Sequence, residues 1–184
     1  RGMGYHTFEG KYSSLKDVPC GPNNYDDNVL AQRIVQSRTH HLENAGNELL
    51  APICDDNGRL LLPLIVSLQE KPLTIIDLGG GLGVGLIHIL NHAAAFPSLR
   101  YLVIETPSMC VAVRTKLQAT IKMKFGNSII VEVQDTMPSP GSLPAGSCIV
   151  NVAGTIQYLD DYWGALGKLA KLEPLFCVVS DTPM

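Results

Sequence analysis

The stretch Ile-Ile-Asp-Leu-Gly-Gly-Gly-Leu-Gly-Val-Gly, residues 75–85, decides the fold of this protein. It ends a short β-branched run that we expect to form a strand over residues 73–77, and it leads into an apolar stretch that predicts a helix over residues 85–96. Glycine is needed between the two elements because the backbone must turn sharply and let a ligand approach closely. The pattern is typical of the first turn in a nucleotide-binding α/β sheet.

Downstream of this turn, β-branched runs alternate with helical patterns. The predicted strands span residues 99–105, 128–133, 148–152 and 175–179, and the predicted helices span residues 108–122 and a stretch that begins at Asp160 or Asp161 and ends near 171. Such alternation indicates a parallel sheet with helices on both faces. We therefore predict an α/β fold with a doubly wound, Rossmann-like, mostly parallel sheet that ends after its fifth strand.

The N-terminal part has a different texture. Residues 1–72 open with an irregular stretch rich in Gly, Pro and Asn, followed by helical spacing after Asp26 and a second helical pattern over residues 60–68. We predict one structural domain overall, with an N-terminal lid and helices over residues 1–72 and a Rossmann-like core over residues 73–184.

Composition narrows the class of function. Of the 184 residues, 46% are hydrophobic and 17% are charged, which is enough apolar material for a packed core. The net charge of -3 concentrates no positive charge, so we expect no nucleic-acid partner. Because no apolar run has the length of a membrane span and no signal segment opens the sequence, we expect a cytoplasmic protein without a membrane partner.

The apolar runs also predict that several particular side chains are buried in the core. The five cysteines are scattered without a C-x-x-C pair, which favours reduced thiols, and we expect Cys148 and Cys177 to be small core residues. We expect Tyr162 and Trp163 to pack the helix after the fourth strand against the sheet.

The spacing of the glycines separates three kinds of nucleotide site. The dinucleotide pattern G-x-G-x-x-G fails from Gly79, Gly81 and Gly83, and no Lys-Ser or Lys-Thr pair follows as in a phosphate-binding P-loop. The pattern D-x-G-x-G-x-G fits, with Asp77 as its first residue. It resembles motif I of the class I methyltransferases that depend on S-adenosylmethionine (SAM), and this resemblance implies SAM as the cofactor.

Acidic residues follow the next two predicted strands. Glu105 ends the second strand, where an acid can accept hydrogen bonds from both ribose hydroxyls, although a solvated strand end is the alternative. Asp135 follows the third strand, where methyltransferases often place a residue near the adenine amino group; an ordinary turn residue is the alternative. The resemblance thus implies a cofactor-binding set that consists of Tyr12, Asp77, Gly79, Gly80, Gly81, Gly83, Glu105, Asp135, Ala153 and Gly154.

The order of motifs is also similar to that of a narrower bacterial family of methyltransferases defined by sequence alone. The matching segments are residues 8–14, 25–26, 77–83, 104–107, 156–159 and 182–184. This resemblance implies methyl transfer to a small-molecule acceptor, such as a sugar or another small metabolite. The family usually carries an Asp-Arg pair where this chain has Ser180 and Asp181, so no role of that arginine is carried over.

Methyl transfer sets two requirements on the side chains of the site. The acceptor atom must be held in line with the methyl group, and an amine or hydroxyl acceptor also needs a general base. Because ligands of open α/β sheets sit at the carboxyl ends of the strands, we name Tyr158 and Asp181 as candidate catalytic residues, with His41 of the N-terminal part as a third. We predict no metal site, because His88 and His92 have no third ligand in the pattern.

Two other functions fit parts of the sequence. A sheet that ends after five strands exposes an edge, so we expect either an oligomer or partner chain that covers the edge, or a further C-terminal segment that continues the sheet. Together with the change at residues 180–181, this edge favours a non-catalytic methyltransferase-like partner subunit or binding module as the alternative. A nicotinamide-dependent reductase is a third interpretation, and the failed dinucleotide pattern counts against it.

Overall fold

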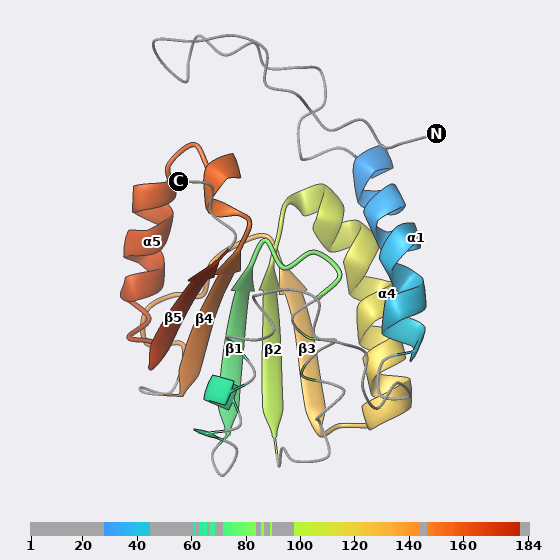
Figure 1. Cartoon of the computed structure of the whole chain (residues 1–184), viewed down its shortest axis with the longest axis horizontal. Helices are drawn as coiled ribbons and strands as arrows, with labels where there is room; N and C mark the ends of the chain where they lie inside the picture. Colours follow the sequence, from blue (N-terminus) through green and yellow to red (C-terminus); the bar gives the residue numbers. More distant parts are fainter. Residues whose placement is uncertain are drawn as a thin grey trace, which may run out of the picture.

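The computed structural model describes residues 28–44, 72–83, 98–143 and 147–180, together with residues 61, 63–65, 67–68, 86 and 89. Its elements are, in chain order, α1 (Asn28–Asn44), β1 (Leu73–Leu78), β2 (Leu99–Ile104), α4 (Pro107–Phe125), β3 (Ile129–Gln134), β4 (Cys148–Ala153), a 3-10 helix (Ile156–Tyr158), α5 (Tyr162–Ala170) and β5 (Phe176–Ser180). Figure 1 shows the strands side by side, with α1 and α4 next to each other and α5 near the opposite edge.

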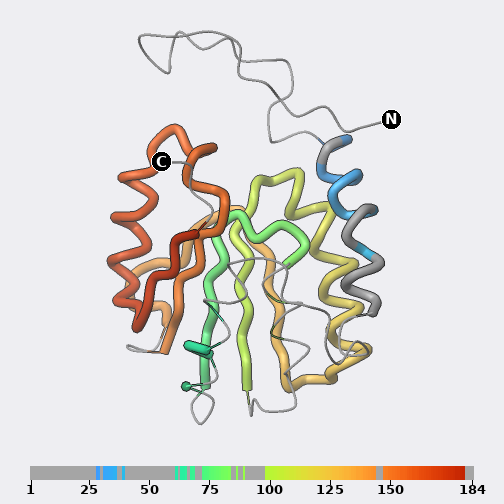
Figure 2. The backbone as a smooth tube through the Cα atoms, in the orientation of Figure 1, coloured from blue at the N-terminus to red at the C-terminus, as the bar shows by residue number. Residues whose placement is uncertain are grey.

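The five strands form one parallel sheet in the order β3-β2-β1-β4-β5. Chain order reverses at β1, which has β2 on one side and β4 on the other, and ligands of open α/β sheets bind at such a reversal. The carboxyl ends of all five strands lie at the same edge, as the backbone path in Figure 2 shows. The predicted doubly wound parallel sheet is therefore confirmed.

Two buried clusters pack on opposite faces of the sheet. Ile75 and Tyr101 belong to the cluster that includes the buried side of α4 and Ala31 of α1. Ile76 belongs to the second cluster, with Leu169 of α5. Because both faces are covered at its centre, β1 is buried along its whole length, as an apolar parallel strand requires.

Side-chain caps explain where α4 and α5 begin. Thr106 precedes α4, and its side-chain oxygen accepts a hydrogen bond from the Met109 N–H at 3.4 Å. Asp161 caps α5 by accepting a hydrogen bond from the Gly164 N–H at 2.8 Å, which decides between the two aspartates that the sequence offered.

Two core assignments were wrong. The Trp163 side chain is 72% exposed and that of Tyr162 is 38% exposed, because α5 packs through Leu169 instead, and Trp163 lies about 120° from Leu169 around the helix. Cys148 is buried as expected, but Cys177 is exposed, since strand alternation on the edge strand β5 places it opposite the buried Val178.

The N-terminal segment predicted as a lid and helices is described only in part. The helix expected after Asp26 is confirmed as α1, whereas the opening stretch with Tyr12 lies outside the described residues. The boundary at residue 72 and the partner that would cover the β5 edge stay predictions, although Leu61 and Ala31 belong to the same buried cluster as the sheet. No helix in the described part of the chain is long and apolar enough to cross a membrane.

Candidate functional site

The turn after β1 is shaped by glycines in the left-handed backbone region. Gly79, Gly81 and Gly83 have φ angles of 72°, 54° and 71°, which L side chains rarely adopt. A Cβ on Gly79 would also lie 2.1 Å from the side-chain oxygen of Thr155, in the loop after β4. The turn therefore lies against the β4 loop at a distance that only glycine permits.

The Asp77 side chain lies against the same turn, buried near the end of β1. Its Oδ2 accepts a hydrogen bond from the Tyr101 hydroxyl of β2, and its Oδ1 accepts one from Asn151 Nδ2 of β4 at 2.7 Å. A Cβ on Gly80 would lie 2.4 Å from Asp77 Oδ2, so the carboxylate and the turn are in direct contact. Burial raises the pKa of Asp77 to about 6, while the bonds from Tyr101 and Asn151 lower it and the charge of Glu105 raises it.

Glu105 lies directly after β2 and bonds to the turn from the other side. Its Oε1 accepts a hydrogen bond from the Gly81 N–H at 2.8 Å, and its Oε2 accepts one from the Thr106 N–H at 3.0 Å. Partial burial raises the pKa of the Glu105 carboxyl, and the two backbone bonds lower it. The carboxylate is thus fixed by the backbone on both oxygens.

The segments that follow β3 and β4 also lie at the carboxyl ends of the strands, beside the glycine turn. Asp135 follows β3 and is exposed, and the loop after it runs over residues 136–140. The β4 tip is held to β5, because the Gly154 N–H donates to the Ser180 carbonyl at 3.0 Å. Tyr158 ends the 3-10 helix with its side chain 51% exposed.

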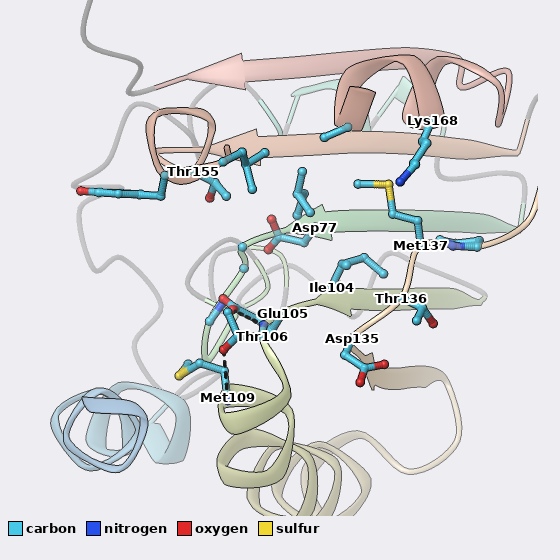
Figure 3. A pocket seen from close by; sticks show the side chains of 18 of the residues that line it. Asp77, Ile104, Glu105, Thr106, Met109, Asp135, Thr136, Met137, Thr155 and Lys168 are labelled. Carbon is cyan, nitrogen blue, oxygen red and sulfur yellow. Dashed lines mark hydrogen bonds between the residues drawn. The ribbon is translucent and has the colours of Figure 1, made fainter. Parts of the chain in front are cut away.

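These segments surround a cavity of about 1210 Å³ at the carboxyl edge of the sheet. Figure 3 shows Asp77, Glu105, Asp135 and Thr155 around it, and Lys168 extending from α5 toward Met137. The charges that line it are acidic at Asp77, Glu105, Asp135 and Asp161, and basic at Lys168 and Lys171. The cavity therefore has the carboxylates of Asp77 and Glu105 beside the glycine turn, and one basic side chain, Lys168, on α5 itself.

Most residues named from the sequence meet at this cavity. Those that line it are Asp77, Gly79, Gly80, Gly81, Glu105, Asp135, Ala153, Gly154 and Tyr158. Gly83 is buried in the turn behind them. Tyr12, Asp181 and the side chain of His41 lie outside the described residues, as do His88 and His92. Within the described ranges, no group of three His, Cys, Asp or Glu residues could hold a metal ion.

Several residues of the site were not predicted to belong to it from the sequence. Thr155 fits against Gly79, Thr106 donates its N–H to Glu105, and Met109 lines the cavity beside them. The pairing of Thr106 with Pro107 was a usable signal, since it marks a helix start directly after the predicted acid. Tyr101 gave no signal beyond its place in an apolar strand, because its link to Asp77 depends on strand order.

No model of a known protein family matches the chain, and no curated protein sequence matches it. The narrower bacterial family that the motif order resembles therefore stays a prediction.

Solved structures of methyltransferases have a similar backbone over part of their length. The methyltransferase domain of bacterial CtHen1 has 20% identity and a TM-score of 0.47, with 67% of this chain and 64% of that chain covered. A SAM-dependent methyltransferase from Aquifex aeolicus has 14% identity and a TM-score of 0.46, with 83% and 70% covered. SAM-bound CalS10, an amino pentose methyltransferase from Micromonospora echinaspora, has 17% identity and a TM-score of 0.40, with 70% and 49% covered. This chain thus spans less than two thirds of the CtHen1 domain.

Proposed function

We propose that this chain binds SAM at the carboxyl edge of its sheet and transfers the methyl group to a small-molecule acceptor. The observation that carries the proposal is the Glu105 carboxylate, which is fixed beside the glycine turn by the N–H groups of Gly81 and Thr106 and faces the cavity.

The donor and acceptor groups of the site fit the nucleoside part of SAM. An ionised carboxylate has about four lone-pair sites, and the two backbone bonds leave room on Glu105 for two hydroxyl donors, such as those of a ribose. A Cβ on Gly81 would find only Glu105 Oε1 at 3.9 Å and Met109 Cε at 4.0 Å. The backbone of the turn is therefore open to a ligand on the cavity side.

The residues around the cavity supply binding, orientation and exclusion of water. SAM, when bound, supplies an electrophilic methyl group on a positively charged sulfur. The carboxylates of Asp77 and Glu105 favour a positively charged ligand at the turn. Proximity and orientation are worth roughly 7–11 kcal/mol in well-aligned systems, so holding the acceptor is the main task of the protein.

The size of the cavity supports a second ligand beside the nucleotide. Pockets for one small molecule usually have about 300–1,000 Å³, and this cavity has about 1210 Å³. Tyr158 at its rim is our candidate for contact with the acceptor, and Asp181 and His41 stay candidates for the general base. We propose a sugar or a similar small metabolite as the acceptor, which agrees with the resemblance noted in the sequence.

The test is the formation of S-adenosylhomocysteine (SAH) from SAM. The purified chain is incubated with SAM and pools of amino sugars, deoxysugars and nucleotide sugars, and SAH is measured by mass spectrometry. We expect SAH above the background of the Glu105→Ala variant with at least one pool. A chain that binds SAH but forms none with any pool would favour the non-catalytic binding module, and a chain that binds NADH instead would favour a reductase.

A further inference from the structure

Three buried polar side chains lie together at the centre of the sheet. Asp77 is on β1, Tyr101 is on β2 and Asn151 is on β4, the two strands that flank β1. In the sheet register Asp77 pairs with Asn151, and Tyr101 pairs with Ile75, two residues before Asp77. Strand alternation therefore places all three side chains on the same face.

The two neighbours hold the Asp77 carboxylate from opposite sides. The Tyr101 hydroxyl donates to Oδ2, and Asn151 Nδ2 donates to Oδ1 at 2.7 Å. One donor on each oxygen fixes the plane of the carboxylate as well as its position. Both neighbours are fully buried, so these bonds form without competition from bulk water.

Asn151 keeps this position at a cost in free energy. Its Oδ1 is buried and has no hydrogen-bond partner within the described part of the chain. An unpaired buried polar atom is unfavourable, and an apolar residue would avoid it. A position where this cost is tolerated for one bond to Asp77 suggests that the bond serves the site.

The orientation of the carboxylate determines where the glycine turn lies. Gly80 is so close to Asp77 Oδ2 that a Cβ there would overlap with it at 2.4 Å. The next residue, Gly81, donates its N–H to Glu105. A carboxylate that rotates or shifts therefore displaces the donor that fixes Glu105.

We propose that Tyr101 and Asn151, which do not line the cavity, are positioning residues of the nucleotide site: they hold Asp77 from both sides and thereby fix the turn that binds SAM. The inference rests on the proposed function, since it concerns affinity for SAM and SAH.

The charge state of Asp77 gives this role a measurable signature. Among the described residues, the titratable groups that face the Asp77 carboxylate are Tyr101 and Glu105. Hydrogen bonds to the ionised form lower the pKa of Asp77, so loss of either donor raises it above its value of about 6. A variant that only loosens packing does not move this pKa in a fixed direction.

The experiment compares Tyr101→Phe and Asn151→Leu with the wild type and with Thr74→Val. Thr74 is a buried polar residue at the start of β1, away from the cavity, and serves as the matched control. The pKa of Asp77 is followed by NMR of carboxyl-labelled aspartate, and the Kd for SAH is measured from pH 5 to pH 8. We expect both variants to raise the pKa of Asp77 and to weaken SAH binding at least tenfold at pH 7. As the pH is lowered from 8 to 5, the affinity of the variants for SAH should fall at a higher pH than that of the wild type, because Asp77 takes up its proton earlier.

The pKa of Asp77 and the Kd for SAH distinguish failure of the positioning role from failure of the proposed function. Folded variants that keep the wild-type pKa of Asp77 would overturn the positioning role, whether or not SAH binds. Variants that shift this pKa while the Kd for SAH stays at the wild-type value would overturn it as well. A wild type that does not bind SAH would overturn the proposed function, and the proposed role in SAM binding with it; the NMR titration would still report whether Tyr101 and Asn151 hold the carboxylate.

Discussion

Glu105, directly after β2, accepts a hydrogen bond from the Gly81 N–H at 2.8 Å, across 24 residues of sequence. The bond joins the ends of two neighbouring parallel strands, because Gly81 lies in the turn after β1. An acid that bonds to the turn in this way cannot be a freely solvated strand end. The bond therefore connects the two sequence features on which the functional proposal depends.

Removal of the Glu105 carboxylate should weaken SAH binding. Hydrogen bonds to charged groups contribute about 1.5–3 kcal/mol, so we expect Glu105→Ala to raise the Kd roughly 10- to 150-fold and Glu105→Gln to raise it less. Glu132→Gln is the control, since Glu132 bonds to Arg100 on the sheet and does not line the cavity. Equal Kd values for wild type and Glu105→Ala in a calorimetric titration would refute the ribose role.

Two glycine-to-alanine changes should have opposite effects. In Gly80→Ala the new Cβ overlaps with Asp77 Oδ2, and we expect a loss of about 1–3 kcal/mol of unfolding free energy, together with weaker SAH binding. In Gly167→Ala the new Cβ meets nothing within 4 Å inside α5, and we expect a gain of roughly 0.5–1 kcal/mol. Urea unfolding measures both changes, and a stable Gly80→Ala variant with normal binding would contradict the close contact.

The pH dependence of stability should report the buried Asp77. Its pKa is raised from 3.8 to about 6 in the folded protein, so the folded state keeps a proton that the unfolded chain has released between these values. The free energy of unfolding therefore falls as the pH rises through this window, by roughly 3 kcal/mol relative to Asp77→Asn. Chemical denaturation at pH 4 and pH 7 tests this, and a difference between wild type and Asp77→Asn that is the same at both pH values would speak against it.

The cap of α5 provides a stability test away from the glycine turn. Asp161→Ala removes the acceptor for the Gly164 N–H, and we expect it to cost about 0.5–2 kcal/mol of unfolding free energy. Asp160→Ala is the neighbouring control and should change the stability by less than about 0.5 kcal/mol. The cap assignment fails if thermal unfolding shows the same shift for both variants.

The features that local sequence controls were predictable. The strand before the glycines and the helix predicted over residues 108–122, which is observed as α4 (Pro107–Phe125), follow from chain chemistry within a few residues. Glu105 could be placed at the cavity because the end of a strand in a parallel sheet has only one location.

The features that depend on contacts between distant segments were not predictable from the sequence. The bond from Tyr101 to Asp77 requires both the order and the register of the strands, and the fit of Thr155 against Gly79 requires the path of the β4 loop. The exposure of Trp163 could not be predicted from its position near the start of a helix. Only the packed helix shows which of its faces is covered.

The most direct test of the central claim is a calorimetric titration of the purified chain with SAH, with NADH as the control ligand. The proposal predicts one SAH site of micromolar affinity, loss of binding in Asp77→Ala, weaker binding in Glu105→Ala and no binding of NADH. A folded chain that does not bind SAH, or that binds NADH more tightly, would contradict it.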